Sequence, residues 1–155
     1  MLNITKSLEI MDALLNTKAK PTNVVSFPVN PYLALFTTVP DDNGQNGVEP
    51  TSEDYRRVLL NKKGFDGKQL LTGAVSETRE INGSEKVCSV VKNQEQILFP
   101  EALNTGYGQI TGFGIFDAAE ETANLIAWGT LTSSQTINQG EIPIFRIGEF
   151  EMMLA

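Results

Sequence analysis

The sequence contains no histidine, and this absence excludes several kinds of chemistry. Histidine is the side chain most often used as a base near neutral pH, and it is a common metal ligand. Serine–histidine and cysteine–histidine catalysis are therefore excluded. The single cysteine, Cys88, leaves no intrachain disulfide and no thiolate zinc site. Its apolar neighbours in EKVCSVVK predict a buried structural thiol.

Basic residues and long apolar runs are also scarce. Twelve lysines and arginines stand against 19 acidic residues, which gives a net charge of −7. A nucleic-acid-binding protein needs a clustered positive face, so we expect no nucleic-acid partner. No run approaches the roughly 18 apolar residues of a membrane span, and Lys6, Glu9 and Asp12 interrupt the pattern of a signal peptide. We expect no membrane insertion, and synthesis in a cytoplasm.

The N-terminal segment has the apolar spacing of a helix. Its polar side carries charged residues, so residues 3–16 are predicted to form an amphipathic helix on a surface. The apolar face contains Ile4, Leu8, Met11, Leu14 and Leu15. Three prolines, Pro21, Pro28 and Pro31, then favour an extended linker. We therefore expect an N-terminal arm over residues 1–31 and a β-rich domain over residues 32–155.

The rest of the chain has the sequence pattern of short strands separated by turns. YLALFTTV, from Tyr32, has apolar residues on both alternating sets, which is typical of a strand covered on both faces. Strand-like segments recur to the final EFEMML, and Asn82–Gly83 and Ser133–Ser134 are read as turns between them. Residues 40–54 are expected to form a long exposed loop. The predicted fold is mainly β: an antiparallel β-sandwich or open barrel with the N-terminal helix.

The glycine-rich stretch GYGQITGFGIF has a spacing that resembles a nucleotide-binding loop. The glycines miss the dinucleotide spacing by one residue, and no helix follows a strand there, so a phosphate loop is not expected. We predict instead that two strands pair around Asp117–Ala123 and share one packing motif. In this motif the glycines leave space that an aromatic side chain fills. Its residues are Gly112, Phe113, Gly114 and Trp128.

Three other patterns could carry chemistry. The acidic loop DDNGQNGVE leaves an irregular calcium site open, although the register of an EF-hand is not met. Tyr55-Arg56-Arg57 could be an anion fork, or the start of a strand whose arginines neutralise the acidic residues nearby. Adjacent carboxylates such as Glu149 and Glu151 are read as solvated groups. We accordingly predict no catalytic, cofactor-binding or metal-binding residue, and no enzyme.

Taken in order, three segments resemble a known family. They are YLALFTTVPDDNGQNGVEPTSEDYRRVLL, ILFPEALNTGYGQITGFGIFDAAEETANLIAWGTL and SQTINQGEIPIFRIGEFEMML, which span Tyr32 to Leu154. This arrangement resembles small bacteriophage virion proteins of the tail-fibre-protein type, which also occur as head-fibre or capsid-decorating modules. The resemblance implies a non-enzymatic β-rich module on the virion, in a tail, baseplate, head fibre or capsid surface. The N-terminal arm could attach it to a larger virion protein.

The first hypothesis is therefore a virion structural protein, made in the host cytoplasm, that assembles as a homo-oligomer, expected to be a trimer. The predicted assembly interface is the helix face of Ile4, Leu8, Met11 and Leu15, docked on a symmetry mate or on another virion protein. The second hypothesis is a carbohydrate-binding host-attachment module, with host-surface glycans as partners and Tyr55, Tyr107 or Phe65 stacking on sugars. The third is a glycan hydrolase that uses aspartate or glutamate.

Overall fold

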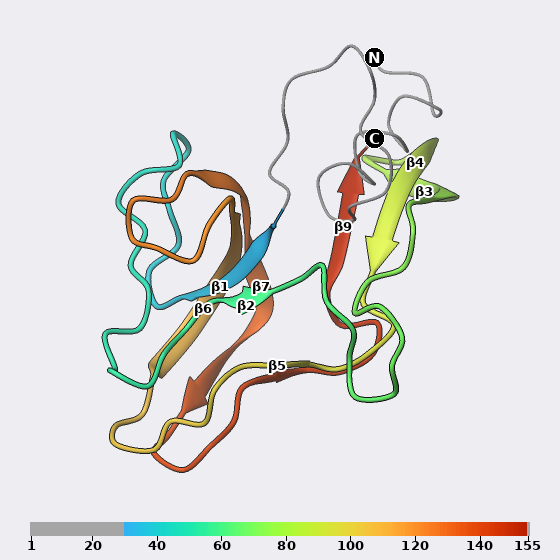
Figure 1. Cartoon of the computed structure of the whole chain (residues 1–155). Helices are drawn as coiled ribbons and strands as arrows, with labels where there is room; N and C mark the ends of the chain where they lie inside the picture. Colours follow the sequence, from blue (N-terminus) through green and yellow to red (C-terminus); the bar gives the residue numbers. More distant parts are fainter. Residues whose placement is uncertain (1–29, 155) are drawn as a thin grey trace. The chain divides into compact units, whose positions relative to one another are not determined.

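The computed structural model of the chain describes residues 30–154 (Figure 1). These residues contain no helix, and none of them forms a helical segment long and apolar enough to cross a membrane. The strands are β1 (Tyr32–Phe36), β2 (Val58–Leu59), β3 (Val75–Ile81), β4 (Ser84–Lys92), β5 (Ile97–Leu98), β6 (Gly108–Phe116), β7 (Leu125–Ile137), β8 (Ile144–Phe145) and β9 (Glu151–Leu154). The pairs β1–β2, β1–β6, β3–β4, β4–β9 and β6–β7 are antiparallel, so the predicted mainly β, antiparallel fold is confirmed. A sandwich or open barrel stays a prediction.

The N-terminal predictions concern residues outside the described part. The helix expected over residues 3–16 and its face of Ile4, Leu8, Met11 and Leu15 lie there, and so does the arm over residues 1–31, apart from its last two residues. Each stays a prediction.

The chain divides into two compact units. Unit 2 consists of Pro31–Leu59 and Leu98–Ile144. The described part of unit 1 consists of Asn30, residues 60–97 and residues 145–154.

Unit 2 is built on a four-stranded sheet of order β2-β1-β6-β7. The central strand β1 is buried on both faces from Leu33 to Phe36, as its apolar sequence predicts. Phe36 packs against Phe116 with ring centroids 6.1 Å apart. Ala34 completes this buried cluster, and Leu125 packs against it. Because residues from β1, β6 and the start of β7 meet here, the cluster holds the sheet to the loop before β7.

The strands β6 and β7 pair around the connection at residues 117–124, as the sequence predicts. Trp128 lies directly opposite Gly114 in this register. The space over Gly114 is nevertheless filled by Phe36: a Cβ added to Gly114 would lie 2.5 Å from Phe36 Cε2. The expectation that Trp128 packs over the glycines is therefore wrong at this position. Phe36 reaches Gly114 diagonally because the residue opposite Gly114 on β1 is only an alanine, Ala34.

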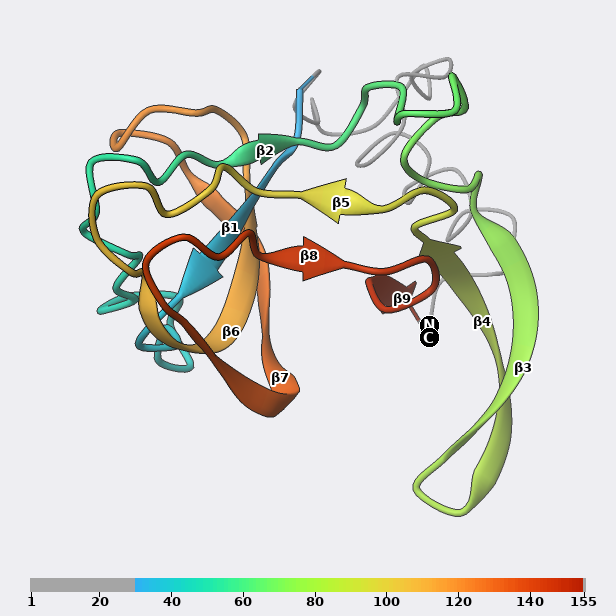
Figure 2. The ribbon, with the colours of Figure 1, turned by 90° about the horizontal axis from the view of Figure 1, so that it is seen from below.

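Unit 1 contains the three-stranded sheet β3-β4-β9. The hairpin turn between β3 and β4 is at Asn82–Gly83, where both residues have positive φ (53° and 76°), which confirms the predicted turn. Within the described residues, strand β9 pairs with Ser89–Lys92 of β4. Figure 2 shows the hairpin continuing beyond that point as a two-stranded ribbon. Cys88 is fully buried, as predicted.

Candidate binding groove in unit 2

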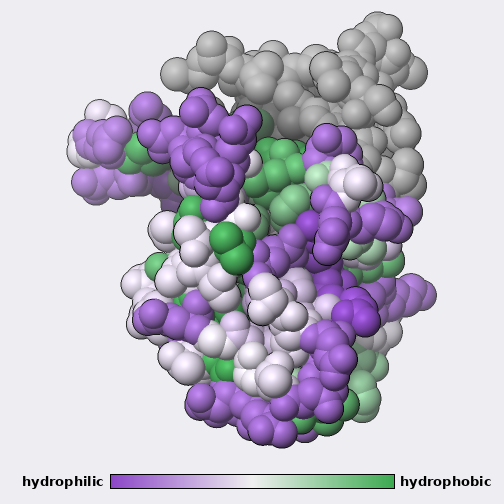
Figure 3. Space-filling view, turned by 90° about the vertical axis from the view of Figure 1, so that its left-hand side faces the viewer, coloured by the Kyte–Doolittle hydropathy of each residue, from purple (hydrophilic) through white to green (hydrophobic). Residues whose placement is uncertain are grey.

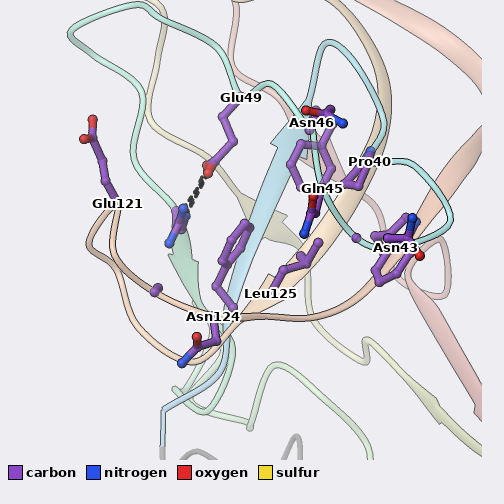
Figure 4. A pocket seen from close by; sticks show the side chains of 15 residues that line it. Pro40, Asn43, Gln45, Asn46, Glu49, Glu121, Asn124 and Leu125 are labelled. Atoms are coloured by element: carbon purple, nitrogen blue, oxygen red, sulfur yellow. Dashed lines mark hydrogen bonds and ion pairs between the residues drawn. The ribbon is translucent and has the colours of Figure 1, made fainter.

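A depression of about 500 Å³ lies in unit 2 between two chain segments, and we refer to it as the groove (Figure 4). One segment is residues 40–49 of the predicted exposed loop, and the other runs from residue 121 to residue 128. The side chains labelled in Figure 4 surround this depression from both segments. The lining residues are Phe36, Pro40, Asn43, Gly44, Gln45, Asn46, Gly47, Glu49, Arg57, Phe116, Glu121, Ala123, Asn124, Leu125 and Trp128.

The first loop is organised by the carboxylate of Asp41. It accepts hydrogen bonds from the backbone N–H of Gln45 (3.0 Å), from the side-chain amide of Asn46 (2.7 Å) and from the backbone N–H of Asn43 (2.9 Å). These bonds, the one from Gln45 foremost, hold the pKa of Asp41 below its usual value. Asp41, one of the acidic residues that suggested a calcium site, thus stabilises its own loop through these hydrogen bonds. Within residues 30–154, no group of three or more acidic or cysteine side chains could hold a metal ion.

The second segment is closed in the same way by Asp117. Its carboxylate accepts hydrogen bonds from the Asn124 backbone N–H (2.7 Å) and side-chain amide (2.8 Å). The bond from the Asn124 side chain is the main cause that lowers the pKa of Asp117. Both walls of the groove therefore carry asparagines whose positions are fixed by an aspartate of the same loop.

Three polar side chains form what we call the clamp, Glu49, Tyr55 and Arg57, of which Glu49 and Arg57 also line the groove. The Arg57 guanidinium makes a two-point ion pair with the Glu49 carboxylate. It also donates to the carbonyl oxygens of Ala118 (3.0 Å) and Glu120 (2.8 Å), and it lies 3.6 Å above the ring of Phe116. Only 7% of the Arg57 side chain is exposed.

The clamp extends to the central strand through Tyr55. The Tyr55 hydroxyl donates to Glu49 Oε2 (2.8 Å) and accepts from the backbone N–H of Leu35 in β1 (2.9 Å). The clamp therefore ties β1 to both walls of the groove. The prediction that arginines after Tyr55 neutralise nearby acids is confirmed for Arg57 and Glu49. Arg56 instead donates to the carbonyl oxygens of Glu53 and Tyr55.

We expect unit 2 to lose stability at alkaline pH because of Tyr55. Burial, with the Glu49 carboxylate as the next cause, raises the pKa of the Tyr55 phenol above its ordinary value of 10.0. Above pH about 10 the unfolded chain releases this proton and the folded chain keeps it, so the free energy of unfolding falls as pH rises. Urea denaturation between pH about 9 and 11 should show a steeper fall for the natural chain than for Tyr55→Phe. Equal slopes would contradict this account.

The aromatic residues proposed to stack on sugars differ in their exposure to solvent. Tyr55 and Tyr107 are 9% and 3% exposed, so the prediction that either forms a sugar platform is wrong. Both rings pack on neighbouring rings within unit 2. Phe65, in unit 1, is fully exposed, and Trp128 is 37% exposed at the groove.

The groove itself was not predicted from the sequence. Its polar lining comes from loops about 80 residues apart, and spacing within one loop does not show that the two meet. The one available signal was that both loops pair an aspartate with a later asparagine, in DDNGQN and in DAAEETAN. The packing residues Gly112, Phe113 and Gly114 lie in β6, whereas Trp128 lies in β7 and lines the groove.

The chain matches a known protein family. A family model described as "Podophage GP4 fiber I protein gp80" matches residues 4–153. No curated protein matches the chain. The matched region includes most of the N-terminal segment as well as both units.

Proposed function

Since the chain belongs to the podophage GP4 fiber I protein gp80 family, we propose that it is a structural subunit of the virion that acts by oligomeric assembly. The observation that carries this proposal is the extent of the match, residues 4–153 of 155. Membership of this family makes the chain a virion-associated fibre protein and confirms the resemblance seen in the sequence. A tail, baseplate or capsid-decorating position, and a homotrimeric state, are parts of the proposal.

The β3–β4 hairpin of unit 1 supports an assembly role. Beyond the part that pairs with β9, side chains on both of its faces are exposed, for example Thr78 and Val87 on one face and Lys86 on the other. Val87 is 56% exposed. A two-stranded ribbon is only marginally stable by itself in water. Contact with a second copy of the chain would bury its apolar side chains and stabilise it.

The proposed role is non-enzymatic. The sequence offers no histidine, and the aspartates nearest the groove hold its loops together through their own hydrogen bonds. Glu49 is likewise held by Arg57 and Tyr55. A carboxylate that accepts several hydrogen bonds is a poor base, which favours a structural use of these groups.

We expect that deleting residues 1–20 leaves a folded chain that no longer enters virions. The physical reason is the predicted docking of Ile4, Leu8, Met11 and Leu15 on a symmetry mate or on another virion protein. The measurement is the amount of the chain in purified particles from a phage that carries the deletion.

The full-length chain should have three times the 17.0 kDa mass of one chain in solution.

The control separates loss of attachment from loss of folding. Circular dichroism and urea denaturation of the deleted chain should match those of the full-length chain. Unchanged incorporation of the deleted chain would refute the anchoring role, and a monomeric full-length chain that does not bind particles would refute the assembly role.

A further inference from the structure

We propose that the groove of unit 2 binds an uncharged glycan, through one pyranose ring stacked at Trp128. This inference goes beyond the assembly role and does not depend on it, because it rests on the groove alone. Its evidence is a partly exposed indole, side-chain amides in the lining, and a charge that disfavours acidic sugars.

Trp128 supplies the apolar part of the site. It is 37% exposed and lines the groove. Its Cζ3 and Cη2 atoms would lie 3.1 and 3.2 Å from a Cβ added at Gly44, whose φ is +72°. The indole therefore packs against the backbone of Gly44, which has no side chain. A pyranose has one face of C–H groups, and such a face packs favourably on the electron-rich face of a large aromatic ring.

Side-chain amides supply the polar part of the site. Asn43 and Gln45 come from the first loop and Asn124 from the second, and all three line the groove. An amide offers both donors and an acceptor, as a sugar hydroxyl needs. The Asp41 and Asp117 hydrogen bonds fix the backbone of the two loops, and Asp117 also holds the side-chain amide of Asn124, so the loops are ordered before a ligand arrives. The lining is thus mainly polar, with one large aromatic ring, which suits a ligand that carries many hydroxyl groups.

The charge of the groove selects against acidic sugars. The lining contains the carboxylates of Glu49 and Glu121 and one cation, Arg57. Arg57 is already bound by Glu49 and by two carbonyl oxygens. An anionic sugar would therefore meet uncompensated negative charge, in a chain whose net charge is −7.

The surface character agrees with a polar ligand. In the space-filling view of Figure 3, hydrophilic and neutral residues predominate, and hydrophobic residues lie in small groups among them. A large contiguous apolar patch would instead indicate a protein partner. One sugar in an open groove is expected to bind with a Kd on the order of 1 mM, and repetition of the site on a particle would raise the avidity.

Intrinsic fluorescence gives a direct test, because Trp128 is the only tryptophan in the chain. The full-length chain is titrated with glucose, galactose, N-acetylglucosamine and their short oligomers, and with galacturonic acid as the anionic probe. We expect a saturable change in emission with at least one uncharged sugar and at least tenfold weaker binding of galacturonic acid. No saturable change with any uncharged probe up to about 50 mM, or equal binding of the anionic probe, would overturn the proposal.

Variants locate the site independently of fluorescence. Saturation-transfer NMR on the sugar should show at least a tenfold loss of binding for Trp128→Ala and a several-fold loss for Asn43→Ala, an exposed loop change that leaves the fold intact. The matched control is Phe65→Ala. This change removes an exposed aromatic ring that lies in unit 1, outside the groove, and should leave binding unchanged. Unchanged binding in both groove variants, or an equal loss in the control, would contradict the assignment. Virion incorporation of Trp128→Ala is expected to be normal, which distinguishes this site from the assembly role.

Discussion

Replacing Glu49 by alanine is expected to lower the free energy of unfolding by about 3–5 kcal/mol, the cost of breaking a buried ion pair from one side. The change leaves the Arg57 guanidinium, 7% exposed, without its carboxylate, and it removes the acceptor of the Tyr55 hydroxyl. Because the clamp joins β1 to both loops, the groove should open as unit 2 unfolds. Urea denaturation followed by the emission of Trp128 measures the loss.

Two matched variants identify the cause. Glu49→Gln keeps the size and the acceptor oxygen but not the charge. Its free energy of unfolding should therefore lie between that of the natural chain and that of Glu49→Ala. Glu53→Ala removes an exposed carboxylate a few residues away and should change stability by no more than about 0.5 kcal/mol. A Glu49→Ala chain as stable as the Glu53→Ala chain would show that the clamp contributes little.

Replacing Gly112 by alanine is expected to destabilise the chain by about 3 kcal/mol through overpacking. The added Cβ would lie 2.5 Å from the backbone oxygen of Gly129 and 2.6 Å from Val39 Cγ2. The Gly129 oxygen belongs to β7, which is paired with β6, so it cannot move away without disturbing the pairing. Denaturation by urea, again followed at Trp128, measures the effect.

Gly140→Ala is the control for a general cost of replacing glycine. Gly140 has a φ of +84°, but no heavy atom lies within 4 Å of a Cβ added there. Its replacement should cost only the left-handed backbone strain, about 1 kcal/mol. If Gly112→Ala were no more destabilising than Gly140→Ala, the close approach of β6 and β7 would not matter for stability.

Features set by local pattern were predictable from the sequence. The apolar alternation from Tyr32 gives a strand buried on both faces, and Asn82–Gly83 gives a hairpin turn, because both depend on residues next to one another. The pairing of β6 with β7 around a short connection was predictable for the same reason. The burial of Cys88 follows from its apolar neighbours.

The predicted end of one strand and the predicted start of another were wrong, because strand pairing in the folded chain outweighs the local sequence pattern. Ser133–Ser134 was read as a turn, yet β7 runs through it to Ile137; the register shift opposite Thr111 absorbs the irregularity without ending the strand. Strand β9 begins at Glu151, two residues later than expected. Glu149 lies outside it and accepts a hydrogen bond from the backbone N–H of Arg146.

The groove and its packing depend on contacts between distant residues. Phe36 fills the space over Gly114, and Trp128 is left to line the groove, because the two side chains lean in directions that spacing does not specify. The burial of Tyr55 and Tyr107 depends equally on which rings meet in the folded unit. Sequence reasoning therefore placed Trp128 over Gly114, where Phe36 packs, and expected Tyr55 and Tyr107 at a surface, where they are buried.

The most direct test of the central claim, that this family member is a subunit of the virion, is the copy number of the chain in purified phage particles, measured by quantitative mass spectrometry. The account predicts a fixed number of copies per particle that is a multiple of three. A chain abundant in infected cells but absent from purified particles would contradict it.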